Sequence, residues 1–224
     1  MWTRLRFRGA ANKENDMKNN TTKQLITRSI MRIGRITALG MVFTCALPLA
    51  AHAQIVLPPV PAGLEVPAGN EAFLLGRGVG TQNYVCQPAD PLGRVAWTLF
   101  TPQATLFSDE GEQLTTHFFS PNPDEGPIVV VRATWQDSQN TSAVWARAIA
   151  AVTVKANAIA QLKLEVVGTQ AGPNGGDTFS GATFVQRLTT EGGLAPTTGC
   201  DALPDVGHKA FIPYTADYVF YRRN

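Results

Sequence analysis

Residues 95–100 read VAWTLF and place the apolar residues Val95, Trp97 and Leu99 at every second position. Successive side chains of a β-strand point to opposite faces of a sheet, so this spacing puts the three residues on one face. The stretch therefore predicts a strand, which a kink at Pro102 separates from a shorter strand over residues 103–107.

Similar strand patterns recur along the chain, with turn residues between them. In residues 128–135 the alternate positions from Val129 to Trp135 share a face, and in residues 214–221 those from Tyr214 to Phe220 do. Further strands are expected over residues 114–119, 144–154, 162–167 and 182–188.

Many short strands and little helix predict a mainly β, single-domain fold, either an antiparallel β-sandwich or a barrel-like fold. Residues 156–163 are the one segment that could hold a helical turn or two. Alternating βαβ units are absent, which argues against a doubly wound nucleotide-binding fold. Residues 76–80, GRGVG, precede strand-like residues and not a helix, so they predict a bulged turn between strands.

The first 53 residues have the order of a secretory signal. Basic residues from Lys18 to Arg35 precede an apolar run over 36–49, and Ala51-His52-Ala53 is a small-x-small cleavage site. A membrane anchor needs about 20 apolar residues, and this run is shorter. We therefore expect cleavage after Ala53, a secreted or periplasmic protein, and no stable membrane insertion afterwards. An uncleaved anchor is the alternative.

Residues 1–16 add nothing that a signal needs, so Met17 is a second candidate for the true start. Residues 1–53 carry nine Lys/Arg and two Asp/Glu, whereas residues 54–224 carry ten and fifteen. The mature part is therefore mildly acidic, at a net −5. Nucleic-acid binding needs clustered positive charge, so no nucleic-acid partner is expected.

The mature part is expected to have two sections. Residues 54–69 hold four prolines and predict an extended Pro-rich segment, because proline cannot donate to a sheet ladder. Residues 70–224 then form a single β domain.

Two cysteines, Cys86 and Cys200, remain after removal of Cys45. An even number in an oxidising compartment predicts one disulfide. Two buried free thiols are the alternative. No CxxC or HxxxH spacing accompanies them, so no metal site is expected.

His117 is the main candidate for catalysis. A triad would have to bring a nucleophile and a carboxylate to it, and Ser108 with Asp109, or Ser120 with Asp124, are near in sequence. No GxSxG elbow is present, so a structural role is favoured. The acidic turns at 109–112 and 124–126 lack the order of a calcium loop and predict solvated turns.

The tryptophans point to a binding site as an alternative to a catalytic site, because aromatic faces can stack on sugar rings. Trp97 fits core packing, whereas Trp135 precedes a polar loop and could lie near a surface.

Several motifs carry a resemblance to a known family. They are VPAGN at 66–70, GVGTQNYVC at 78–86, ATLF at 104–107, ATWQ at 133–136, TFVQRLTT at 183–190, GGLAP at 192–196 and IPYTADYVFY at 212–221. With these motifs the chain resembles a secreted bacterial and fungal family, the domain-of-unknown-function family 3455. The resemblance spans residues 64–221 and is strongest in the C-terminal part. It implies export and a one-domain, mainly β fold, and it carries no catalytic residues. One departure is the segment AIAQLKL at 158–164, where the family usually has an apolar strand with a tryptophan.

These observations favour a non-enzymatic binding or structural domain of the cell envelope or extracellular space, without a cofactor. Its unknown ligand could be a carbohydrate. A secreted hydrolase with a site around His117 is the alternative. The candidate ligand-binding residues are Tyr84, His117, Trp135, Gln186 and Arg187.

Overall fold

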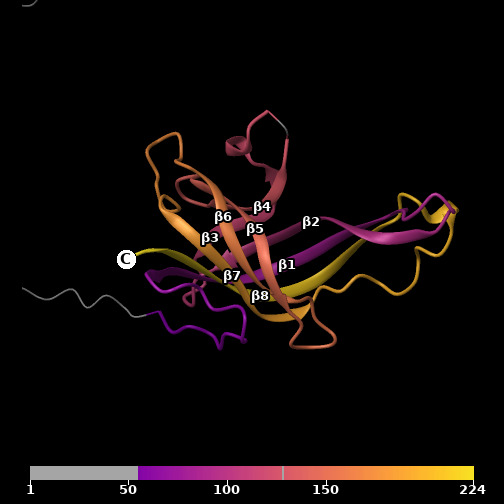
Figure 1. Cartoon of the computed structure of the whole chain (residues 1–224), viewed down its shortest axis with the longest axis horizontal. Helices are drawn as coiled ribbons and strands as arrows, with labels where there is room; N and C mark the ends of the chain where they lie inside the picture. Colours follow the sequence, from indigo (N-terminus) through magenta and orange to yellow (C-terminus); the bar gives the residue numbers. More distant parts are fainter. Residues whose placement is uncertain (1–54, 128) are drawn as a thin grey trace, which may run out of the picture. The chain divides into compact units, whose positions relative to one another are not determined.

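The first strand pairs with the second along one edge and with the last along the other, so the sheet closes on itself (Figure 1). The computed structural model describes residues 55–127 and 129–224. The predicted signal and its cleavage site at Ala51 and Ala53 lie outside these ranges. Every neighbouring pair of strands is antiparallel, and the strand order around the barrel follows the sequence.

The mainly β prediction is confirmed, and of its two alternatives the closed barrel is the one that forms. Two 3₁₀ turns, η1 (Pro123–Glu125) and η2 (Leu203–Asp205), accompany the strands, and the described ranges contain no α-helix. The strands are β1 (Asn70–Pro88), β2 (Val95–Phe107), β3 (Gln113–Pro121), β4 (Val131–Asp137), β5 (Ala143–Val152), β6 (Gln161–Gln170), β7 (Ala182–Gly192) and β8 (Lys209–Arg223).

Alternation along β8 builds much of the barrel interior. As predicted, Tyr214, Ala216, Tyr218 and Phe220 share one face, and all four are at most 3% exposed within the main core. Burial of a large apolar side chain such as Phe220 supplies about 1.5–3 kcal/mol. The last strand is therefore a continuous wall of the core.

A bulge explains why two strands were predicted in β2. In the pairing with β1, Asn83 is opposite Thr101 and Tyr84 is opposite Leu99, so Phe100 is the extra residue. One extra residue reverses which positions face inward. Burial accordingly falls on odd positions up to Leu99 and on even positions from Pro102 onward.

Residues 76–80 lie in the middle of β1, so the predicted bulged turn is wrong. A Cβ built on Gly76 would lie 2.9 Å from Leu106, and one on Gly78 would lie 2.8 Å from the Tyr218 ring. Glycine at every second position lets these neighbouring side chains pack over the backbone of β1. The glycine-rich pattern at residues 76–80 therefore reflects the close approach of neighbouring side chains and not a turn.

Two other local predictions are wrong. Residues 156–160 form a loop and residues 161–163 begin β6, so the helical turn expected over 156–163 does not form. The strand expected from residue 128 begins at Val131, and Val129 is 73% exposed in the segment before it. The local pattern could not show where pairing with a neighbour starts.

The barrel opens on one side because β2 and β3 pair over only a short stretch. Their ladder covers Ala104–Phe107 of β2, whereas β2 continues back to Val95 alongside β1. Strands β1, β2 and β8 therefore run on as a three-stranded arm beyond the rest of the barrel (Figure 1). The separation of β2 from β3 leaves room for a side opening.

A second hydrophobic cluster lies on the outer face of β7 and β8. Leu64 of the Pro-rich segment is fully buried there against Leu188, Val219 and Tyr221. The Gln186 amide also donates to the Leu64 carbonyl at 2.6 Å. Residues 55–69 contain no strand and instead cover this outer face.

In the part of the chain that the structure describes, no helix has the length and apolar character needed to cross a bilayer.

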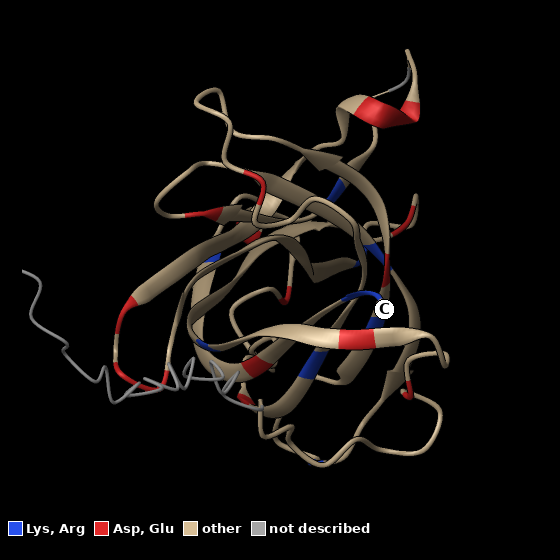
Figure 2. Ribbon diagram, turned by 90° about the vertical axis from the view of Figure 1, so that its left-hand side faces the viewer, with Lys and Arg blue, Asp and Glu red and all other residues tan. Residues whose placement is uncertain are grey.

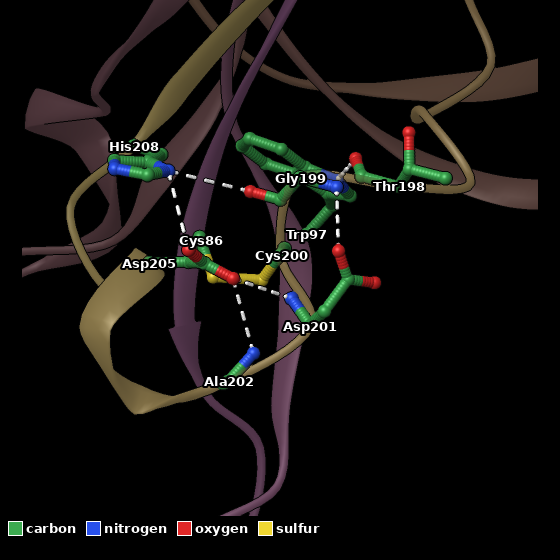
Figure 3. Close-up of a disulfide and its surroundings, with 9 residues drawn as sticks. All are labelled: Cys86, Trp97, Thr198, Gly199, Cys200, Asp201, Ala202, Asp205 and His208. Atoms are coloured by element: carbon green, nitrogen blue, oxygen red, sulfur yellow. Dashed lines mark hydrogen bonds and ion pairs between the residues drawn. A yellow bond between two sulfur atoms is a disulfide. The ribbon is translucent and has the colours of Figure 1, made fainter.

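Figure 3 shows the disulfide at the end of the arm. Cys86 of β1 bonds to Cys200 in the loop between β7 and β8, with the two Cα atoms 5.4 Å apart, so the predicted bridge is confirmed. The Cys86 amide donates to the His208 carbonyl at 2.9 Å. The bridge thus ties a strand to a long loop that has few ladder bonds of its own.

Trp97 lies beside this bridge and not in the main core, contrary to its predicted packing role. Its indole nitrogen donates to the Thr198 carbonyl at 3.1 Å, and its ring meets Gly199 (Figure 3). The Asp205 carboxylate accepts from the backbone amides of Asp201 and Ala202. These contacts order the loop around the disulfide.

Truncation of Leu64 tests the role of the Pro-rich segment. We expect Leu64→Ala to lower the free energy of unfolding by about 2–5 kcal/mol, the usual cost for a buried leucine. Leu57→Ala, in the same segment but 42% exposed, is the matched control and should change it by less than about 0.5 kcal/mol. Guanidinium unfolding measures both, and equal effects would show that the segment does not stabilise the barrel.

Removal of the disulfide should destabilise the protein strongly. The bridge spans 114 residues, for which the chain-entropy model gives about 4–5 kcal/mol, although measured values are often smaller. The double variant Cys86→Ala, Cys200→Ala should therefore unfold at much lower denaturant than the oxidised protein. An unchanged unfolding midpoint would contradict this assignment.

Candidate ligand cavity

A cavity of about 440 Å³ lies inside the barrel. An eight-stranded barrel is just wide enough for its own side chains or for one small ligand, and here the side chains do not fill it. The strands contribute an aromatic floor, a polar wall and an apolar wall. Its lining residues include Gln82, Tyr84, His117, Ala133, Trp135 and Arg187.

The floor is a stack of aromatic rings from three strands. The His117 ring of β3 is stacked on the Trp135 ring of β4, with centroids 4.3 Å apart and planes 8° apart. Tyr218 of β8 meets both rings, at 5.2 and 5.6 Å. Trp135 is fully buried, so the expectation that it lies near a surface is wrong.

His117 is buried and neutral. Burial lowers its pKa from 6.5 to about 3, a hydrogen bond to Thr134 opposes this shift, and the positive charge of Arg187 adds to it. Its Nδ1 lies 2.8 Å from the Thr134 carbonyl oxygen. A carbonyl can only accept, so Nδ1 carries the proton and Nε2 remains an acceptor.

The polar wall is built from β1 and β7. The Tyr84 hydroxyl donates to the Gly193 carbonyl at 2.6 Å, and Arg187 donates through Nε and Nη2 to the Ala160 carbonyl at 3.2 and 2.9 Å. Gly193 has φ +80°, and a Cβ there would lie 3.0–3.1 Å from side chains that include Gln82. Glycine is therefore required where the wall turns.

The positive charge of Arg187 affects the pKa values of three tyrosines on or near this wall. Burial raises the pKa of Tyr84, Tyr214 and Tyr218, and the Arg187 charge lowers each of them in part. The Tyr214 and Tyr218 hydroxyls are 2.9 Å apart and hydrogen-bonded to each other. These tyrosines remain neutral, so they do not neutralise the guanidinium.

Two buried donors at the cavity have no acceptor. Gln82 is 1% exposed and Trp135 is 0% exposed, and both line the cavity. The Nε2 atom of Gln82 and the Nε1 atom of Trp135 have no hydrogen-bond partner among the described residues. Such atoms are rare in native structures because each costs about 1–3 kcal/mol.

Two ion pairs border the opening. Arg132 makes a two-pronged pair with Glu125 at 2.5 and 2.7 Å, and its hydrogen bonds lower the Glu125 pKa to about 2. Arg147 pairs with Glu165 at 2.6 Å. Figure 2 shows that basic residues lie mainly on strands and acidic residues mainly in connecting segments.

Four of the five predicted site residues come together at this cavity: Tyr84, His117, Trp135 and Arg187. Gln186 does not, because it points to the opposite face of β7, where it bonds Leu64 and accepts from Tyr221.

Sequence reasoning missed five polar or aromatic lining residues: Gln82, Phe119, Arg132, Arg147 and Tyr218. The signal for Gln82 was its position two residues before Tyr84 on the same strand, which places both side chains on one face.

The proposed hydrolase residues are not assembled. Ser108 accepts from the Glu110 and Glu112 amides, and Asp109 pairs with Arg77 at 2.9 Å. Neither residue lines the cavity that contains His117. Within the described ranges, no three His, Cys, Asp or Glu side chains are placed to hold a metal ion.

A family model described as "Protein of unknown function (DUF3455)" matches residues 67–222. The chain belongs to the DUF3455 family. Comparisons with curated proteins and with solved structures gave no match. The DUF3455 region spans all eight strands and therefore the whole cavity.

In this DUF3455 domain the AIAQLKL segment lies between the cavity and the Pro-rich segment. Leu162 and Leu164 line the cavity, Gln161 is 6% exposed, and Lys163 donates to the Glu65 carbonyl at 3.0 Å. Its polar side therefore faces the Pro-rich segment.

The buried His117 should make the DUF3455 domain acid-sensitive. An unfolded histidine titrates near 6.5, so between pH 6.5 and 3 the unfolded state binds more protons and stability falls as the pH falls. At pH 4.5 this one group should cost about 2–3 kcal/mol relative to pH 7. His117→Gln should therefore lose less stability between these pH values than the wild type.

His208→Gln is the matched control, because the His208 side chain is 59% exposed. It should keep the wild-type pH dependence in guanidinium unfolding. An identical pH dependence for His117→Gln and the wild type would show that His117 is not buried as a neutral group.

Proposed function

We propose that this protein is exported and that its barrel binds a small organic molecule in the interior cavity. It acts as a non-enzymatic binding protein in the periplasm or extracellular space. The single observation that carries this proposal is the pair of unpartnered buried donors, Gln82 Nε2 and Trp135 Nε1, beside a cavity. Binding sites for small molecules are cavities of about 300–1,000 Å³ with a few placed polar groups.

Export is supported by the disulfide and by the leader sequence. The Cys86–Cys200 bridge is typical of an oxidising, extracytoplasmic compartment. The signal-like order of residues 1–53 supports the same location. Neither nucleic acid nor a membrane is proposed as a partner.

Binding is favoured over hydrolysis by the composition of the cavity. The described residues that line it include no serine, cysteine, aspartate or glutamate. A hydrolase built on His117 would need a nucleophile within hydrogen-bond reach. His117 covers one face of the Trp135 ring, so that face cannot stack on a ligand.

Filling the cavity should abolish binding. Ala133 lines the cavity and packs against the core, so Ala133→Phe should place a ring in the cavity. Ala96→Phe, at an exposed position of β2, is the matched control. A thermal-shift screen of organic acids, amides, glycans, peptidoglycan fragments and lipids measures binding to each protein.

A ligand at about 100 times its dissociation constant stabilises the native state by about 2.7 kcal/mol. We expect at least one class to raise the melting temperature of the wild type and of Ala96→Phe but not of Ala133→Phe. Equal responses in all three proteins would place binding outside the cavity, and no response from any class would contradict the proposal.

A further inference from the structure

We propose that the occupant of the cavity is an organic carboxylate with an apolar body, and that its carboxylate pairs with Arg187. This inference rests on the proposed function and adds the chemical class of the ligand. It is carried by the charge, the donors and the apolar wall of the cavity.

Arg187 is unusual among the arginines of the described ranges. Five of them have a carboxylate within 4.0 Å: Arg77, Arg94, Arg132, Arg147 and Arg222. Of the two without such a partner there, Arg223 is exposed at the chain end, whereas Arg187 is half-buried and lines the cavity. A partly desolvated cation without a counter-ion is costly unless an anion joins it.

The guanidinium retains binding capacity. It has five N–H donors in a planar fork; the Ala160 carbonyl occupies two of them, and the Tyr218 hydroxyl lies within reach of the same guanidinium. The fork matches the two oxygens of a carboxylate, with which arginine forms strong two-pronged pairs. Ala160 thereby holds the side chain in place against the cavity wall.

No acidic residue competes for this charge. The described lining residues include three arginines and no aspartate or glutamate, although residues 54–224 have a net charge of −5. Arg132 and Arg147 already have carboxylate partners at the opening. The free positive charge of the cavity is therefore at Arg187, and an anion is the complementary ligand.

Two buried donors point to the same ligand chemistry. Gln82 Nε2 and Trp135 Nε1 belong to residues that line the cavity and have no partner there, so a carboxylate or other ligand oxygen that reached them would satisfy them. The remaining wall is apolar, with Ile159, Leu162 and Leu164. This combination fits a molecule with an oxyanion at one end and hydrocarbon along its length.

Matched neutral and charged probes test the inference without any mutation. Benzoate and benzamide, and octanoate and octanamide, differ within each pair only in the carboxylate. Isothermal titration of the oxidised protein should show that at least one carboxylate binds ten or more times tighter than its amide. The preference should decrease as salt concentration rises, because salt screens the charge.

A charge-removing variant then locates the effect. Arg187→Gln should reduce the carboxylate affinity tenfold or more and leave the amide affinity unchanged, and Arg187→Lys should recover part of the loss. Arg222→Gln is the matched control, because Arg222 pairs with Glu71 outside the cavity. It should bind both probes as the wild type does.

The outcomes separate this inference from the proposed function. Equal binding of carboxylate and amide, or a preference that survives in Arg187→Gln, overturns the inference while the cavity still binds a ligand. Absence of binding by every probe of the wider screen overturns the proposed function and the inference together. If Arg187→Gln does not fold, the wild-type comparison and the Arg187→Lys variant decide.

Discussion

The closing ladder between β1 and β8 is the constraint on which the rest of the structure depends. It runs from Asn70 opposite Arg223 to Val85 opposite Lys209, and it joins the two ends of the domain. Closure removes both sheet edges and separates an inner from an outer face on every strand. The glycines of β1 let Tyr218 of β8 and Leu106 of β2 pack closely over the β1 backbone.

Closure also explains why the protein has two hydrophobic clusters. The inner cluster is built from alternate residues of the strands, whereas the outer one on β7 and β8 needs the Pro-rich segment as its cover. The inner cluster ends at the aromatic floor of Trp135 and His117. Above this floor the barrel is not filled, and Arg187 lines the remaining space together with Gln82 and Trp135, whose unpartnered donors are buried in its wall.

Alternation predicted most strands and the inward face of β8, because a period of two is a local property. The closure, the bulge at Phe100 and the role of Gly76 and Gly78 could not be predicted, since they depend on pairing partners distant in sequence. Gln186 and Arg187 are adjacent on a strand and so must face opposite sides. That rule alone could have excluded one of these two residues from the candidate ligand-binding site.

The most direct test of the cavity assignment is the response of the tryptophan indole signals to benzoate in a ¹H–¹⁵N spectrum. The Trp97 and Trp145 indoles already donate to Thr198 and Ser120, whereas the Trp135 indole is unpartnered at the cavity. After assignment with Trp135→Phe, we expect the Trp135 signal to move with benzoate concentration and the other two to remain. Movement of Trp97 or Trp145 with a fixed Trp135 signal would contradict a ligand site inside the barrel.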